Sequence, residues 1–272
     1  MTAMSTNFVM KKIDDLPENP FENIVPDGGF CAVFRTIGFV GDSLSSGEFE
    51  ALTPEGVRSW HDKYEYSWGQ FIARRCGLKA INFSRGGMSA REYLEGFADE
   101  KDFFNPDYRC QAYIMALGVN DVTGILGNSY ELGTVDDINI QNYALNKPTF
   151  AGWYGAIISK YKEIQPHAKF FLMTMPKGDE DKNRDELYDK HAELINEIAE
   201  KFSNCFVLDF RKYAPVYDDA FKKAFFTGGH MNVMGYRMTA TMVESYIDYI
   251  IRNNPDSFNQ TGFIGKLHYN AE

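Results

Sequence analysis

A serine follows a short apolar run in the first sixth of the chain. Residues 37–40 are apolar, Gly41 ends the run, and Ser43 follows in a segment rich in Gly and Ser, which is unsuited to continue a strand. In open α/β sheets ligands bind beyond the carboxyl ends of the strands, so a side chain at this place reaches a substrate. Ser43 is therefore a candidate nucleophile. The alternative is that Asp42 and Ser43 only cap a helix.

Serine is a weak nucleophile unless a neighbouring base accepts its proton. His230 is the candidate base, because it lies in a Gly-rich segment that leads into the last predicted helix. The other histidines fit less well. His167 precedes a predicted strand and so lies at the wrong end of the sheet, His191 lies on a charged helix, and His61 and His268 lie in polar segments.

Two more polar segments follow predicted strands. One contains Asn82 with Gly86 and Gly87, and the other is the run 118–121, which contains Asn120. Together with the Ser43 and His230 segments they form four blocks at the same edge of the expected sheet. Taken singly, the glycines could be ordinary turn residues and the 118–121 run an ordinary helix cap.

Strands and helices alternate along the chain. Besides the run before Ser43, the pattern predicts strands at 79–83, 111–117, 168–175 and 205–210, and helices at 64–76, 90–97, 150–164, 185–202 and 233–251. Ser89 and Glu92 have the spacing of a capping box for the second of these helices. We therefore expect an α/β fold with three layers, a flavodoxin-like parallel sheet of about five strands, and helices on both faces.

A single domain is expected over residues 1–272. Residues 1–35 are rich in turn signals and are predicted to wrap around the sheet, whereas 254–272 form a tail without a clear element. The segment 123–148 has only a weak pattern, which is typical of an insertion, here on the active face.

Composition excludes several classes of partner. The formal net charge is -10 and no basic cluster opposes it, so neither nucleic acid nor an anionic membrane is expected as a partner, and small neutral or cationic substrates fit better. The four cysteines are widely spaced without a Cys-x-x-Cys pair, so we predict buried free thiols and no metal site. No signal peptide or membrane-spanning run is apparent, which predicts a cytoplasmic protein without stable membrane association; a homo-oligomer is compatible with the sequence.

The four blocks, in this order, resemble those of the SGNH hydrolase superfamily, the GDSL esterases and lipases, over positions 41–236. The resemblance implies a serine esterase without a cofactor, in which Ser43 attacks and His230 is the base. It also implies an oxyanion hole made of the Ser43 amide, the Gly87 amide and the Asn120 side chain. Asp42 is interpreted as structural and Asp121 as a helix cap.

One position departs from the family pattern. The family places an aspartate three residues before the histidine, to hold the imidazole, and here that residue is Thr227. A backbone carbonyl is our first candidate for this role, which would give a Ser-His dyad. The other candidates are carboxylates or the threonine hydroxyl itself, at Glu48, Glu50, Asp218, Asp219 and Thr227.

We expect the enzyme to hydrolyse short-chain esters, with acetyl favoured, of carbohydrates or other small alcohols. No long apolar lid is evident, and several aromatic residues near the blocks could stack on a sugar, namely Trp60, Tyr64, Tyr66, Trp68 and Trp153. The alternatives are a lysophospholipase, a thioesterase or an acyltransferase. From another class, a flavodoxin-like protein could bind a flavin phosphate on the loop after the first strand.

Overall fold

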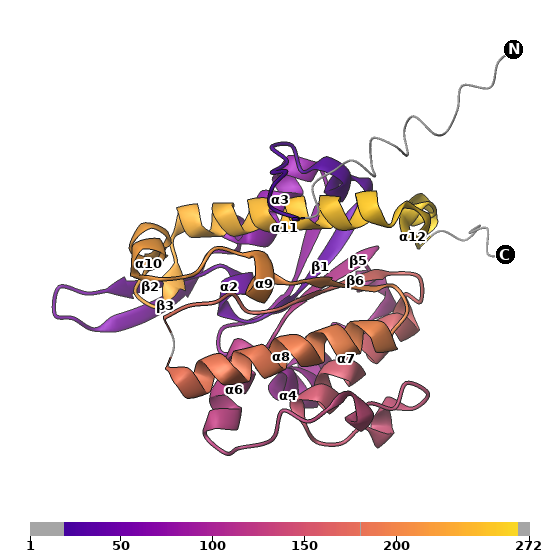
Figure 1. Cartoon of the computed structure of the whole chain (residues 1–272), viewed down its shortest axis with the longest axis horizontal. Helices are drawn as coiled ribbons and strands as arrows, with labels where there is room; N and C mark the ends of the chain where they lie inside the picture. The colour runs from indigo at the N-terminus through magenta and orange to yellow at the C-terminus, as the bar shows by residue number, and fades with distance from the viewer. Residues whose placement is uncertain (1–18, 180, 266–272) are drawn as a thin grey trace, which may run out of the picture.

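A parallel five-stranded sheet forms the centre of the computed structural model, which describes residues 19–179 and 181–265 (Figure 1). The strand order is β4-β1-β5-β6-β7. The strands are β1 (Thr36–Gly41), β4 (Lys79–Ser84), β5 (Ala112–Ala116), β6 (Lys169–Met173) and β7 (Cys205–Leu208). The predicted α/β class, strand number and flavodoxin-like order are confirmed.

The order of the strands places three of the four blocks side by side, after β4, β1 and β5. β1 pairs with β4 on one side and with β5 on the other, all in parallel register. The chain thus leaves β1 toward one edge of the sheet and later continues from β5 toward the other. Such a reversal creates a crevice at the carboxyl ends of the two strands. Ser43 follows β1 and Asn120 follows β5, so both lie at this crevice.

Two layers of helices cover the sheet, as expected. One face carries α3 (Trp68–Cys76) and α11 (Val233–Asn253), and the other carries α7 (Phe150–Ile164) and α8 (Lys182–Lys201) (Figure 1). Each layer has its own apolar core. Phe39 and Ile114 point into the first core, whereas Val40 and Tyr113 point into the second. Because neighbouring residues of a strand face opposite sides, these apolar runs bury both faces of the sheet.

Local signals explain most helix boundaries. Ser67 caps α3 through the Gln70 amide, so the helix begins later than predicted, after a 3-10 turn. The capping box of Ser89 and Glu92 is confirmed at the start of α4 (Ala90–Glu92). A π-helical turn at Tyr93–Phe97 then interrupts the predicted helix before α5 (Ala98–Glu100). The remaining short helices are α2 (Ser43–Ser46), α6 (Val119–Leu126), α9 (Phe210–Tyr213), α10 (Asp219–Phe225) and α12 (Pro255–Phe258).

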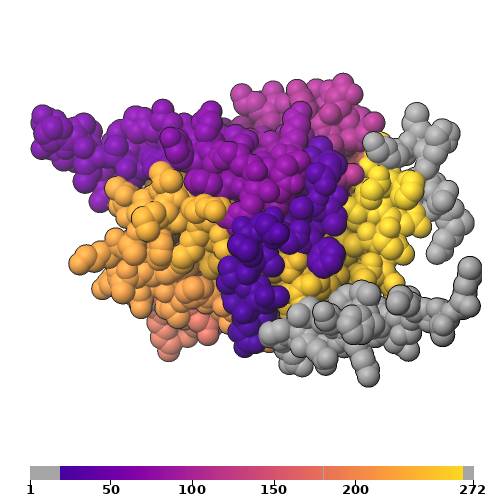
Figure 2. Space-filling model, turned by 90° about the horizontal axis from the view of Figure 1, so that it is seen from above, coloured from indigo at the N-terminus to yellow at the C-terminus, as the bar shows by residue number. Residues whose placement is uncertain are grey.

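A β-hairpin between Ser43 and α3 was not predicted. Its strands are β2 (Glu48–Leu52) and β3 (Arg58–Asp62), paired in antiparallel register. The hairpin projects at the left of the molecule, beside the segment that contains α10 (Figures 1 and 2). A second short pair, β8 (Phe226–Thr227) and β9 (His230–Met231), lies against its base.

The two ends of the chain pack on the body as far as they are described. The amide of Phe30, in the predicted wrap, donates to Asp248 of α11 at 2.8 Å. In the predicted tail, Phe258 is buried, and the Thr261 carbonyl accepts a hydrogen bond from Gln111. The segment 123–148 contains the end of α6 and two 3-10 turns, at Val135–Asp137 and Tyr143–Leu145.

Candidate active site

Ser43 is the first residue of α2, directly beyond β1. Asp42 caps this helix, and its carboxylate accepts a hydrogen bond from the Leu44 amide at 3.0 Å. The structural role predicted for Asp42 is thus confirmed. Burial raises the pKa of Asp42 to about 7. Gly41 is required by a close approach, because a Cβ there would lie 2.2 Å from Ser45 Oγ.

His230 is reached through a tight turn. It pairs with Thr227 across the β8–β9 ladder, and Gly228 and Gly229 connect the two strands. Thr227 is exposed to solvent, and Asp218 instead caps α10 by accepting from the Phe221 amide at 2.9 Å. Among the described residues, neither these two nor Asp219 makes a hydrogen bond or ion pair with the imidazole. The structure therefore does not assign the orienting role to Thr227, Asp218 or Asp219.

Glu50, at the base of the hairpin, faces Nδ1 of the His230 imidazole. Its Oε2 lies 3.7 Å from His230 Nδ1 and accepts a hydrogen bond from the Gly229 amide at 2.7 Å. Arg58 reaches its Oε1 at 3.2 Å. The Gly229 hydrogen bond is the main reason that the pKa of Glu50 is lowered. An ionised carboxylate thus lies beside Nδ1, which makes no hydrogen bond among the described residues, neither to Glu50 nor to a backbone carbonyl. The backbone carbonyl, our first candidate, is not bonded to the ring among the described residues, and the orienting role stays a prediction, with Glu50 as the carboxylate beside Nδ1.

Glu48, two residues earlier on the same face of the hairpin, lies at the other nitrogen. Its Oε1 is 3.1 Å from His230 Nε2. Its Oε2 lies close to Gly86, because a Cβ added to Gly86 would be only 2.2 Å from this oxygen. Burial raises the pKa of Glu48, although His230 has an opposite, smaller effect. No hydrogen bond joins Ser43 to His230 within residues 19–179 and 181–265. Instead, the Glu48 carboxylate lies at Nε2, the nitrogen that a general base would direct toward the serine.

Asn120 and Gly87 lie beside the nucleophile helix. The Asn120 amide nitrogen donates to the Met88 carbonyl at 3.1 Å and approaches Asp42 Oδ2 at 3.5 Å. Gly87 has a φ of +71°, which L side chains rarely adopt. Asp121 does not cap its own helix, which corrects the prediction. Its buried carboxylate accepts from the Ala90 amide at 3.0 Å and thereby satisfies the start of α4.

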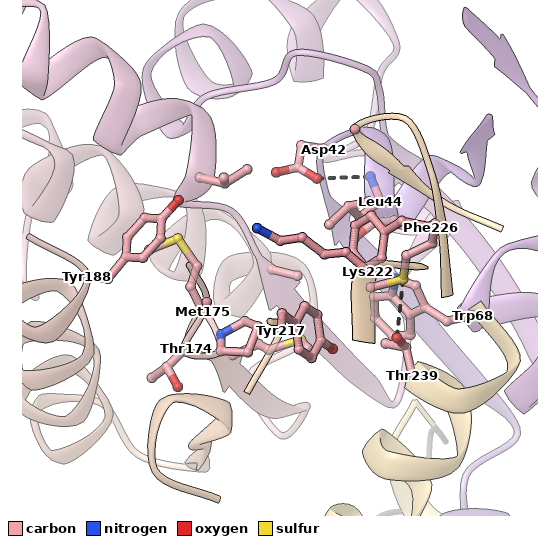
Figure 3. Close-up of a pocket in the computed structure, with 18 of the residues that line it drawn as sticks. Asp42, Leu44, Trp68, Thr174, Met175, Tyr188, Tyr217, Lys222, Phe226 and Thr239 are labelled. Atoms are coloured by element: carbon pink, nitrogen blue, oxygen red, sulfur yellow. Dashed lines mark hydrogen bonds between the residues drawn. The ribbon is translucent and has the colours of Figure 1, made fainter. Parts of the chain in front are cut away.

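Two concave regions flank these residues. The first, here called the apolar cavity, has a volume of about 410 Å³ and lies between the Ser43 helix and the segment before His230 (Figure 3). Asp42 and Leu44 contribute to its wall on one side, and Gly228 and Gly229 on another. The second, here called the polar hollow, has about 620 Å³ and is lined by Gly87 and Asn120, together with Arg85, Ser89, Arg91, Glu92 and Tyr130.

The five aromatic residues proposed to stack on a sugar differ in exposure, and Tyr64 is half-buried. Trp68 and Trp153 are buried in the two cores. Trp60 and Tyr66 are exposed to 54% and 49% and remain available for a ligand. Trp60 pairs with Glu50 across the hairpin, so its side chain lies on the same face as the two glutamates.

The burial of His191 was not apparent from the sequence. It is fully buried on α8 against the Phe150 ring, and a Cβ on Gly118 would lie 2.5 Å from its Nε2. Burial lowers its pKa to about 4. The charged residues around it in the sequence concealed that it lies on the inner face of the helix, directly behind the Asn120 turn.

The described residues contain no group of three or more His, Cys, Asp or Glu side chains arranged to hold a metal ion. The four cysteines are free; Cys31, Cys76 and Cys110 are buried and Cys205 is half-buried. Within the described part of the chain, no helix has the length and apolar character needed to cross a membrane.

Several solved structures share this fold at low sequence identity. A family 2 carbohydrate esterase with a carbohydrate-binding domain, from Corynascus thermopiles (Myceliophthora fergusii), is 17% identical with a TM-score of 0.53, over 78% of this chain and 65% of that chain. A family 2 carbohydrate esterase from Clostridium thermocellum is 15% identical with a TM-score of 0.53, over 82% and 65%. The acetyl xylan esterase AlAXEase is 18% identical with a TM-score of 0.51, over 78% and 99%.

Among curated protein sequences none matches this chain significantly. The sequence profile of the GDSL-like Lipase/Acylhydrolase family, in contrast, matches residues 39–238. This range begins in β1 and ends in α11, so it includes Ser43, Asn120 and His230. The chain belongs to the GDSL-like lipase/acylhydrolase family, the SGNH hydrolases.

Proposed function

We propose that this acylhydrolase cleaves esters of carbohydrates or other small polar alcohols through an acyl-enzyme on Ser43. The observation that supports this proposal best is the position of His230, which lies against the nucleophile helix and has the ionised Glu50 carboxylate beside Nδ1. A carboxylate at that nitrogen stabilises the imidazolium that forms when the ring accepts a proton.

The reaction has two halves. Ser43 Oγ attacks the ester carbonyl carbon while its proton passes to His230 Nε2, and the same proton then leaves with the alcohol. Water attacks the acyl-enzyme with His230 again as the base, and the acid is released. In both halves the negative oxygen is stabilised by the amides of Ser43 and Gly87 and by the side chain of Asn120. Glu48 must leave Nε2 before the first proton transfer.

The two concave regions suggest which part of the ester lies where. The polar hollow offers charged and hydroxyl groups, which suit the hydroxyls of a sugar. Trp60 provides an exposed ring on the same hairpin as Glu50. We favour carbohydrate esters as the class of substrate, because proteins of similar fold are named carbohydrate esterases and an acetyl xylan esterase.

The length of the acyl group remains a prediction. The sequence favoured acetyl, whereas the apolar cavity next to the Ser43 helix has room for a longer chain. That cavity is the observation in favour of the second candidate function, a lysophospholipase or thioesterase, or transfer of the acyl group to another alcohol. The flavin-binding alternative is superseded, because the match to an acylhydrolase family includes the loop that was considered for the flavin phosphate.

The test is hydrolysis of p-nitrophenyl esters of two to eight acyl carbons, by the parent enzyme and by Ser43→Ala. Acetylated xylan and glucose pentaacetate would be assayed in parallel for released acetate. We expect ester cleavage by the parent, loss in Ser43→Ala, and full activity in the matched control Ser59→Ala on the exposed hairpin. Cleavage that survives in Ser43→Ala, or no cleavage of any ester by the parent, would contradict the proposal.

A further inference from the structure

The apolar cavity contains a positive charge that the proposed mechanism does not use. Lys222 lies on α10, is half-buried, and its side chain points into the middle of the cavity (Figure 3). Its ammonium group has no ion pair and donates no hydrogen bond within residues 19–179 and 181–265. The backbone amide of Lys222 bonds to Asp218 and holds the residue in the helix, so only the ammonium is left without a partner.

The surroundings of this ammonium are mainly apolar. Met175, Tyr217 and Phe226 lie around it in the wall, and Leu44 closes the side toward the nucleophile helix (Figure 3). Asp42 is the one acidic residue among those that line the cavity in the described part of the chain, and its carboxylate already accepts the Leu44 amide. Lys177, an exposed residue, is the other basic residue among them. A cation that is partly shielded from water interacts more strongly with an entering anion than one in bulk solvent does.

The cavity is also too large for an acetyl group. Its 410 Å³ falls within the range of about 300–1,000 Å³ typical of pockets that enclose ligands of drug size. Ser43 itself does not line the cavity, whereas its neighbours Asp42, Leu44 and Ser45 do, so an acyl group on Ser43 has to be longer than acetyl to extend into it. Since an apolar chain gains free energy for each methylene removed from water, the cavity favours acyl groups that extend into it.

We propose that the apolar cavity binds an acyl chain that is longer than acetyl and ends in a negatively charged group, which pairs with Lys222. A dicarboxylic acid joined to an alcohol through one carboxyl group has this chemistry. The inference rests on the proposed function, because it places the acyl group of the same ester. It also differs from the expectation for the whole chain: the net charge of -10 suggested neutral or cationic substrates, but the local charge at this site is positive.

The experiment compares pairs of p-nitrophenyl esters of equal chain length, one neutral and one with a terminal carboxylate. The pairs are butyrate with hydrogen succinate, pentanoate with hydrogen glutarate, and hexanoate with hydrogen adipate. At the best length we expect the parent to cleave the carboxylated ester with a kcat/KM at least tenfold above that of its neutral partner, the effect of about one hydrogen bond between charged groups. Lys222→Met should abolish that ratio and Lys222→Glu should invert it, whereas Lys223→Met, at the exposed neighbour, should keep it.

A binding measurement separates this inference from the proposed function. Monomethyl adipate and methyl hexanoate would be titrated calorimetrically into Ser43→Ala, which binds without cleaving, and into Ser43→Ala combined with Lys222→Met. Tighter binding of monomethyl adipate that depends on Lys222 would support the site even if no ester were hydrolysed. Equal binding of the two probes, or a preference for the carboxylated ester that persists without Lys222, would overturn it. So would a parent enzyme that hydrolyses the acetate ester best of all.

Discussion

Glu48 Oε1 lies 3.1 Å from His230 Nε2, the nitrogen that has to accept the proton of Ser43. An ionised carboxylate at this distance holds a proton on Nε2, and a protonated nitrogen cannot act as a base. Glu50, two residues later, lies at the opposite nitrogen and favours the reaction. The two glutamates project from one face of the hairpin, but they are expected to affect catalysis in opposite directions.

Replacement of Glu48 by alanine should therefore increase kcat/KM for p-nitrophenyl acetate at pH 8 by about two- to tenfold, the range expected for one competing hydrogen bond. Because burial raises the pKa of Glu48, its carboxyl group is protonated more readily than an ordinary glutamate, and the competition weakens as the pH falls. The ratio of variant to parent should thus rise with pH. Glu55→Ala, at the exposed hairpin tip, is the control; a ratio that is below one or independent of pH would contradict this interpretation.

Replacement of Glu50 by glutamine should lower kcat by roughly 10²- to 10⁴-fold, because the imidazolium loses its carboxylate partner while the side chain keeps its shape. The lowered pKa of Glu50 means that the parent retains this carboxylate into the acidic range. Steady-state kinetics would show the loss mainly in kcat. Thr227→Val and Asp219→Asn serve as controls that should leave the rate unchanged. If either control were as inactive as Glu50→Gln, the orienting role would belong elsewhere.

Replacement of Asn120 by alanine should reduce kcat by about 10²- to 10³-fold with a small change in KM, as expected for the loss of one oxyanion donor. The amide already points toward the Ser43 helix, where it reaches Asp42 Oδ2 at 3.5 Å. Thermal unfolding of the variant would be measured alongside the kinetics. Asn253→Ala, at the far end of α11, is the matched control. A change confined to KM would assign Asn120 to substrate binding instead.

The alternation of strands and helices was sufficient to predict the sheet, because buried parallel strands are nearly continuous apolar runs. The hairpin was missed, because Glu48, Phe49 and Glu50 alternate in a short, polar segment that resembles a loop. The signal that could have found it is the run 53–56, Thr-Pro-Glu-Gly, a turn between two alternating segments. The π-helical turn at Tyr93–Phe97 has no comparable signal in the sequence.

Some residues of the candidate site could be predicted from the sequence and others could not. Ser43, Asn120 and His230 each follow or precede an element that periodicity reveals, so their common edge could be inferred. For the residue beside His230 Nδ1 the sequence offered Glu50 only as one of several candidates, because Glu50 reaches the ring through the missed hairpin and a hydrogen bond to Gly229. The burial of His191 depends on which face of α8 meets the sheet, and a helix of largely charged residues obscures that face.

Replacement of Met175 by tryptophan should shift the preference of the enzyme toward short acyl groups. Met175 points into the apolar cavity, so a larger ring would occupy space that a longer chain needs (Figure 3). The ratio of kcat/KM for p-nitrophenyl hexanoate to that for the acetate should fall at least fivefold, an effect on the scale of a few buried methylene groups. Met234→Trp, at an exposed position of α11, is the control, and an unchanged ratio in Met175→Trp would place the acyl chain outside this cavity.

His191 should make the protein less stable in weak acid. Its pKa is about 4 in the folded chain and near 6.5 when unfolded, so between these values only the unfolded state binds the proton. Stability is therefore lost as the pH falls from 6.5 to 4, with a contribution of roughly 2 kcal/mol between pH 7 and pH 5. Urea denaturation at both pH values should show this contribution in the parent and in His167→Gln, an exposed control, but not in His191→Leu. An equal pH dependence in His191→Leu would show that the buried imidazole is not its source.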